Sequence, residues 1–117
     1  MTKCKTLSCV QRSAWHNSHD HGFHKAKGNH FMRPNTRLML MVSEVAEAME
    51  ELREGHAPNE IYFGKGNKPE GVPIELADVV IRIGDFAQEY GFDLQEAVQM
   101  KMAFNKTRPK MHGGKKF

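Results

Sequence analysis

The sequence predicts an all-α protein, a small four-helix bundle that associates into oligomers. Apolar residues recur at three- and four-residue steps along most of the chain. Glycine and proline gather in short stretches between these segments. The chain has 117 residues and no internal repeat, which predicts a single domain spanning residues 1–117.

A first helix is expected over residues 6–18, where Leu7, Val10, Ala14 and Trp15 follow helical spacing. The stretch after it is rich in histidine, glycine and lysine, which is typical of a loop. Residues 1–35 are therefore interpreted as an N-terminal helix followed by a histidine-rich loop.

Two long helices are expected next, over residues 36–54 and 73–90, each with one broad apolar stripe. Gly55 and Gly91 are natural stops for them. The composition of the stretch between the two helices predicts a loop. Within this loop, residues 61–63 form either a short strand or an apolar flap.

A last helix is expected over residues 94–106, because Asp93 and Glu96 form a capping-box pattern at its start. Residues 36–108 thus make up the helical core of the domain, and residues 109–117 form a basic tail. The apolar stripes are extensive for so short a chain, which predicts that they are covered in a homodimer or a tetramer.

Charge is unevenly distributed, although the formal net charge is only +3. Residues 1–37 carry seven basic residues and one acid, residues 38–96 carry four and thirteen, and residues 97–117 carry six and none. Nucleic acid is not the expected partner, because the acidic middle repels a phosphate backbone. No apolar run approaches the ~20 residues of a membrane span. Two cysteines are too few for a disulfide framework, so the expected location is cytoplasmic.

Four carboxylates are expected to meet between the second and third helices. Glu44 and Glu47 are three residues apart on one helix, and Glu75 and Asp78 are three apart on the next. Residues at this spacing share a helix face, and both pairs adjoin an apolar stripe. Carboxylates held together need cations, and hard oxygen ligands suit Mg²⁺, with Mn²⁺ as the alternative. A single such pair would be better explained as ordinary surface acids.

Basic residues near the C-terminus complement these acids. Lys101 and Asn105 are four apart on one face of the last helix, and further basic residues follow among proline and glycine. A basic segment beside a metal cluster suits a polyphosphate. Taken alone, the same tail is more commonly a solubilising terminus.

Together these motifs resemble the MazG-like, all-α nucleoside triphosphate pyrophosphohydrolases. The likeness covers about residues 31–108 and consists of E-x-x-E on one helix, E-x-x-D on the next and K-x-x-x-N-x-x-R at the last. The resemblance implies hydrolysis between the α- and β-phosphates of a nucleoside triphosphate, which yields the monophosphate and pyrophosphate.

The resemblance also implies a metal centre. On this basis Mg²⁺ is held by Glu44, Glu47, Glu75 and Asp78, bridges phosphate oxygens and lowers the pKa of a bound water. Glu44 and Glu47 then count as catalytic, together with Glu51, which accepts the proton of the water.

Substrate contacts follow from the same resemblance. Lys101, Asn105 and Arg108 are expected to hold phosphate oxygens and to offset developing charge. His19 matches a histidine that contacts substrate in some relatives. Arg82 is expected to reach a phosphate or to pair with an aspartate of its own helix.

Base recognition departs from the family pattern. Aromatic residues that contact the base in some relatives correspond here to Glu54 and Arg82. Other aromatic side chains are therefore the candidates for stacking on a base: Trp15, Phe31, Tyr62 and Phe63. Of these, Trp15 is better explained as a core residue of the first helix.

The sequence is also compatible with two functions other than nucleotide hydrolysis. The first is a non-catalytic module of the same fold that senses a nucleotide or binds a partner. The second is a zinc-containing nucleic-acid binder that uses Cys4 and Cys9 with His19, His21 or His24. We rank this metal site below a loop of polar, partly protonated histidines.

Overall fold

The computed structural model describes residues 3–22 and 33–109. Within these ranges the chain forms four α-helices, which are α1 (Leu7–Asp20), α2 (Pro34–Arg53), α3 (Val72–Tyr90) and α4 (Leu94–Lys106). The predicted all-α class is confirmed for this part of the chain. Three features considered on the sequence, His24, Phe31 and the tail over residues 110–117, lie outside it.

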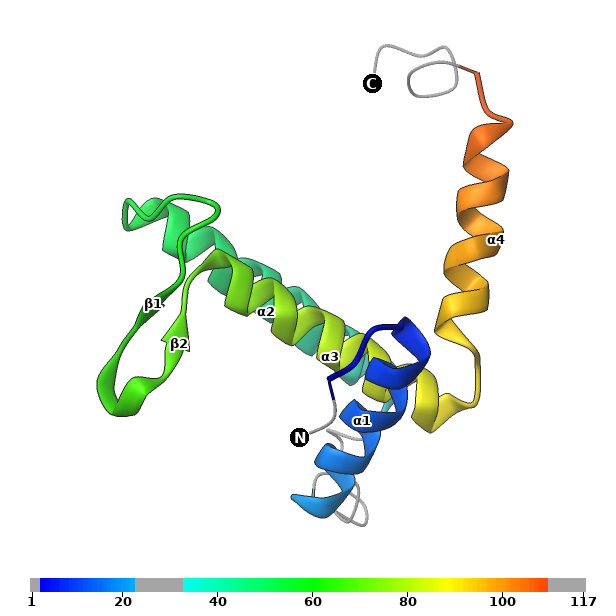
Figure 1. The fold of residues 1–117 in the computed structure, drawn as a ribbon, viewed down its shortest axis with the longest axis horizontal. Helices are drawn as coiled ribbons and strands as arrows, with labels where there is room; N and C mark the ends of the chain where they lie inside the picture. The colour runs from blue at the N-terminus through cyan, green and yellow to red at the C-terminus, as the bar shows by residue number, and fades with distance from the viewer. Residues whose placement is uncertain (1–2, 23–32, 110–117) are drawn as a thin grey trace.

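Two long helices form the centre of the molecule. Figure 1 shows α2 and α3 side by side and antiparallel, with α1 crossing the C-terminal end of α3. Gly84 lets α1 approach closely, since a Cβ at this position would lie 3.1 Å from the Cα of Gln11. None of the helices in the described ranges combines the length and the apolar content that crossing a membrane requires.

A short hairpin occupies the predicted loop between α2 and α3. Strand β1 (Tyr62–Phe63) pairs antiparallel with β2 (Pro69–Glu70), and Tyr62 stands opposite Glu70. Of the two alternatives for residues 61–63, the short strand is therefore the one found. Its partner β2 was not predicted, because two residues are too few to show an alternating pattern.

Capping side chains set the helix ends. The Thr6 hydroxyl accepts the backbone N–H of Cys9 at 3.1 Å, and the Asp93 carboxylate accepts that of Glu96 at 3.0 Å. The second of these is the cap that the sequence predicts for α4. Gly91 ends α3 with φ of 74°, a left-handed conformation that glycine adopts without strain. The chain therefore turns sharply before α4.

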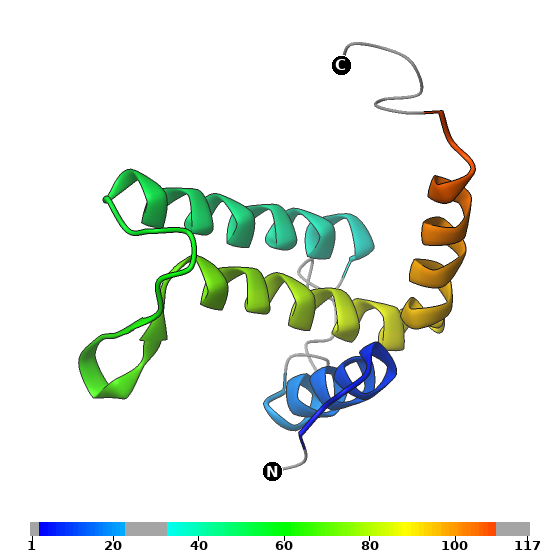
Figure 2. The same ribbon diagram turned by 45° about the horizontal axis from the view of Figure 1, so that its top comes forward.

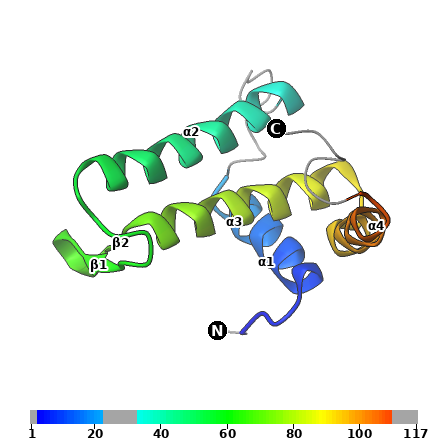
Figure 3. The ribbon, with the colours of Figure 1, turned by 90° about the horizontal axis from the view of Figure 1, so that it is seen from above.

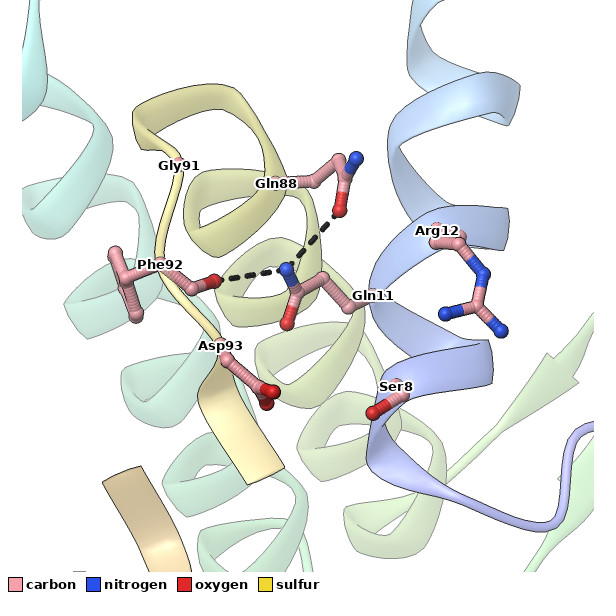
Figure 4. A pocket seen from close by; sticks show the side chains of 7 residues that line it. All are labelled: Ser8, Gln11, Arg12, Gln88, Gly91, Phe92 and Asp93. Carbon is pink, nitrogen blue, oxygen red and sulfur yellow. Dashed lines mark hydrogen bonds between the residues drawn. The ribbon is translucent and has the colours of Figure 1, made fainter. Parts of the chain in front are cut away.

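Helix α4 leaves the α2–α3 pair at this turn. It contacts α1 near its start and then extends away from the other helices (Figure 2), and Figure 3 shows it end-on, across the direction of α2 and α3. The side chain of Gln11 stabilises the turn between α3 and α4. The Gln11 amide Nε2 donates to Gln88 Oε1 at 3.0 Å and to the Phe92 carbonyl at 2.8 Å, while its Oε1 accepts the Leu94 N–H at 3.0 Å. Figure 4 shows Gln11 lining a small pocket between α1 and this turn.

A single chain leaves many large apolar side chains in solvent. The buried apolar residues among those described are short: Ala14, Ala48, Val72 and Ala87. A stripe on α2 is instead 45–60% exposed, and we call it the α2 stripe: Leu38, Val42, Val45, Met49 and Leu52. Its alternating four- and three-residue steps are the spacing of a seam between two packed helices.

Candidate metal centre

The predicted carboxylates face one another across the seam between α2 and α3. Glu44, Glu75 and Asp78 each place a carboxylate oxygen so that the three oxygens lie within 4.8 Å of one another. Glu44 is buried, Glu75 is partly buried and Asp78 is exposed. Glu47 is not one of this set, but its side chain hydrogen-bonds to that of Glu75. Three of the four predicted ligands thus have the spacing of ligands to one ion.

Glu75 is the carboxyl that is hardest to ionise. Burial, the hydrogen bond to Glu47 and the charges of Glu47 and Glu44 raise its pKa from 4.5 to about 7. Carboxylates that lie close together raise one another's pKa when nearby cations do not balance their charge. The donor set is also all oxygen, which suits a hard divalent cation. Both properties of the cluster fit Mg²⁺ or Mn²⁺.

Arg82 brings positive charge to the cluster from α3. Its Nη2 and Nε atoms lie 3.0 and 3.1 Å from Oε1 of Glu44. The sequence left open a phosphate or an aspartate of the same helix as the partner of Arg82, whereas this ion pair crosses the seam to a buried acid. Asp85 of α3 also reaches across the seam, where its Oδ2 is 2.7 Å from Nη2 of Arg37.

Glu51 is held by the loop that follows α2. The Tyr62 hydroxyl donates to its carboxylate, at 2.7 Å from Oε2 and 3.0 Å from Oε1, and this bond raises the pKa of Tyr62 to about 12. The His56 ring stacks on the Tyr62 ring with centroids 4.3 Å apart. His56 Nδ1 lies 2.9 Å from Glu60 Oε2, and its Nε2 lies 3.7 Å from Glu51. Glu51, Glu54 and His56 form a second set with oxygen and nitrogen atoms within 4.8 Å.

The aromatic candidates for base stacking differ in their exposure and in their contacts with other side chains. Tyr62 is tied to Glu51, whereas Phe63 beside it is 67% exposed. Trp15 is only partly buried, so it is not the core residue that its spacing predicts. Its indole N–H donates to Glu89 at 2.5 Å near the C-terminal end of α3, and its ring stacks on His19 with centroids 4.9 Å apart.

The predicted phosphate-binding residues lie on a separate element. Lys101, Asn105 and Arg108 are all exposed, on α4 or just after it. Lys101 Nζ lies 5.2 Å above the Phe104 ring, and the Arg108 guanidinium lies 5.9 Å from it. Because α4 extends away from α2 and α3 (Figure 2), these residues do not join the carboxylates of their own chain.

The zinc site considered on the sequence does not form within the described part of the chain. Cys4 and Cys9 stand at the start of α1, whereas His19 and His21 stand at its end. A helix of 14 residues spans about 20 Å, so these side chains lie too far apart to share an ion. Neither cysteine belongs to a metal-ligand set among the residues described.

Two contributors to the site were missed on the sequence, His56 and the hydroxyl of Tyr62, and so was the pairing of Arg37 with Asp85. Each acts through a partner on another segment, and a pattern within one helix does not reveal such a pairing. One signal was available for Arg37 and Asp85. They stand seven residues before Glu44 and seven after Asp78, where antiparallel packing brings them opposite each other.

Comparisons of the chain with protein-family models, with curated proteins and with solved structures find no match. The relation to MazG-like enzymes therefore rests on the motifs quoted above and stays a prediction.

Proposed function

We propose that the protein is a Mg²⁺-dependent nucleotide pyrophosphohydrolase that acts as a homo-oligomer. It would split a nucleoside triphosphate into the monophosphate and pyrophosphate. The observation that carries this proposal is the convergence of Glu44, Glu75 and Asp78 from two helices. It is supported by the raised pKa of Glu75, because a cation is what this cluster lacks.

The residues of the cluster would bind one hard cation. Glu44, Glu75 and Asp78 would hold it, with Glu47 beside them. When bound there, Mg²⁺ supplies positive charge that polarises a phosphoryl group. Magnesium is usually shared between a few carboxylates and the phosphates of a substrate. The exposed Asp78 leaves the cluster open on one side, as a shared ion requires.

Glu51 is the proposed acceptor of the proton from the attacking water. It lies one helical turn beyond Glu47 on α2. The hydrogen bond from Tyr62 fixes the orientation of its carboxylate. Arg82 has one exposed side and a second side on Glu44, so it can hold a phosphate oxygen next to the cluster.

A second copy of the chain would complete the site. Within one chain, α4 carries Lys101, Asn105 and Arg108 away from the carboxylates. The α2 stripe offers a surface on which another copy can pack, because its exposed side chains have the spacing of a helix–helix seam. We therefore infer that α4 of one protomer supplies phosphate contacts to the carboxylates of its partner.

The test of the reaction is a pyrophosphate-release screen over ribo- and deoxynucleoside triphosphates with Mg²⁺ and with Mn²⁺. Asp78→Asn and Glu47→Gln should lower the rate by roughly 100-fold or more, while circular dichroism shows an intact fold. Glu50→Gln, an exposed acid on the same helix that pairs only with Arg53 in the described ranges, is the matched control. Wild-type rates in both site variants would refute the proposal.

Shared sites can be tested by mixing two inactive proteins. Asp78→Asn damages the metal cluster, and Arg108→Ala damages the α4 contribution. If α4 serves the partner, a mixed oligomer contains one intact site, and activity returns on mixing. No recovery in oligomers shown by mass spectrometry to be mixed would mean that each chain completes its own site.

Oligomer formation has its own control. Val45→Glu places a charge in the α2 stripe, whereas Ser43→Glu places the same charge at an exposed position on the opposite side of α2. Only the first should shift the protein to monomers in analytical ultracentrifugation. Oligomers that survive Val45→Glu would exclude the stripe as the interface.

The alternative is a non-catalytic module that senses a nucleotide or binds a partner. The separation of α4 from the carboxylates within one chain favours it over a monomeric enzyme. The same screen distinguishes the two functions. Tight nucleotide binding without release of pyrophosphate, in the presence of either metal, would establish the alternative.

A further inference from the structure

Two thiols lie together at the start of α1, away from the carboxylate cluster. Cys4 precedes the helix and is exposed, while Cys9 stands in the first helical turn and is partly exposed. Both are free cysteines, and their side chains hydrogen-bond to each other. The Cys4 Sγ also lies 3.5 Å from the Ser13 hydroxyl.

The helix cap explains why the thiols meet. Thr6 is in an extended conformation, and its hydroxyl accepts the N–H of Cys9 at 3.1 Å. Cys9 and Ser13 are four residues apart, so they share one face of α1. The contact with Ser13 places Cys4 over this same face, beside Cys9. A disulfide then requires Cys4, an exposed residue that precedes the helix, to move until the two sulfurs are about 2 Å apart.

The two thiols differ in pKa. Hydrogen bonds from Cys9 and Ser13, together with the charge of Arg12, lower the pKa of Cys4. Its hydrogen bond to Cys4 and partial burial raise the pKa of Cys9. Redox dithiols share this asymmetry, in which an exposed thiolate attacks first and a more protonated thiol resolves the product.

We propose that Cys4 and Cys9 form a reversible intramolecular disulfide by exchange with a low-molecular-weight disulfide such as oxidised glutathione. The Cys4 thiolate attacks one glutathione sulfur, the glutathione S–S bond breaks, and one glutathione thiolate leaves. Cys9 then loses its proton to solvent and attacks the Cys4 sulfur of the mixed disulfide. A second glutathione thiolate leaves, so the cysteine pair is oxidised by two electrons and the glutathione disulfide is reduced to two thiols.

The test uses the full chain and oxidised glutathione without oxygen, followed by acid quenching, alkylation and mass spectrometry. Wild type should accumulate the Cys4–Cys9 disulfide. Cys9→Ser should trap glutathione on Cys4, and Cys4→Ser should trap it on Cys9 roughly tenfold more slowly. The difference between the two rates should disappear in denaturant. Equal rates in the folded chain, or disulfides only between chains, would overturn the proposal.

A serine pair separates local chemistry from general exposure. Ser13→Ala removes the hydroxyl beside Cys4 and should slow trapping on Cys4 in the Cys9→Ser background roughly threefold. Ser18→Ala makes the same change further along α1 and should leave the rate unchanged. Equal rates for both serine variants would show that the folded environment of Cys4 does not control its reactivity.

Discussion

The two ends of the seam between α2 and α3 treat charge in opposite ways. At one end, Arg37 and Asp85 form an ion pair at 2.7 Å, with side chains only 10% and 12% exposed. At the other end, Glu44, Glu75 and Asp78 crowd together, and Arg82 is the cation that reaches Glu44. The same two helices thus neutralise charge within the protein at one end and leave a deficit of positive charge at the other. This difference supports the proposal that a cation binds at the second end.

The neutralised end also has a cost. The Arg37 guanidinium lies 6.0 Å from the Phe86 ring centre and 5.7 Å from that of Tyr90, which favours a cation there. Its Nη1 is nevertheless buried with no hydrogen-bond partner among the described residues. A buried pair of this kind contributes little net stability, but it becomes expensive when one partner is removed.

The largest expected effect is therefore at the neutralised end. Arg37→Ala leaves Asp85 buried without this partner and should lower the free energy of unfolding by about 3 kcal/mol. Denaturant titration measures it. Arg53→Ala, which breaks the exposed pair with Glu50, should cost less than about 0.5 kcal/mol. Replacing Arg37 by Met together with Asp85 by Leu should stay within about 1 kcal/mol of wild type, and a loss as large as that of Arg37→Ala would contradict this account.

At the carboxylate end, removing a charge should stabilise the metal-free protein. The pKa of Glu75 is raised in the fold, because the folded protein favours the protonated carboxyl. The stabilisation by protonated Glu75 is fully present below the unfolded pKa near 4.5 and is lost as pH rises through the folded pKa of about 7. Glu75→Gln should thus stabilise the protein at about pH 8 in chelator by about 1 kcal/mol, after allowance for solvent screening. The gain should vanish at about pH 4. A destabilised variant at the higher pH would mean that the carboxylates are not short of a cation.

A smaller effect is expected when Arg82 is removed. The guanidinium competes with a bound ion for Glu44, so Arg82→Gln should tighten Mn²⁺ binding roughly threefold in a calorimetric titration. Arg53→Gln is the control, because it removes an equal charge at an exposed pair outside the cluster. Weaker binding in Arg82→Gln would show that Arg82 organises Glu44 for the ion instead of competing with it.

The smallest effect concerns His56, which lies beside Glu51. Its hydrogen bond to Glu60 raises the pKa of His56 and lowers that of Glu60. The stabilisation by protonated His56 is fully present below its unfolded pKa near 6.5 and is lost as pH rises through the higher folded value. His56→Gln should thus be less stable than wild type near pH 6 and match it near pH 9 in thermal unfolding. A constant difference across this range would assign the effect to ring stacking on Tyr62.

The sequence predicted the carboxylate end better than the neutralised end for a physical reason. Glu44, Glu75 and Asp78 belong to motifs with helical spacing, so their faces follow from local periodicity alone. The bond from Arg82 to Glu44 depends on the register between two helices, which local spacing does not define. The bond from Tyr62 to Glu51 depends on a hairpin of two-residue strands that leaves almost no pattern.

The direction of α4 was beyond prediction for a similar reason. Its start at Asp93 follows from a local cap, and the cap is observed. The angle at which it leaves α3 depends on Gln11, more than 70 residues earlier in the sequence. Apolar stripes show which face of each helix is covered but not which helix covers it, and the α2 stripe is left exposed within one chain.

The Gln11 contacts also affect how the chain folds during synthesis. The amide of Gln11 bonds to Gln88, Phe92 and Leu94, with sequence separations of 77, 81 and 83 residues. Helix α1 therefore leaves the ribosome well before residues 88–94, which contain the partners of Gln11. The α2–α3 hairpin, whose contacts are closer in sequence, should form before α1 docks. Docking of α1 then fixes the course of α4, so this corner of the molecule can form only after residues 88–94 have been made.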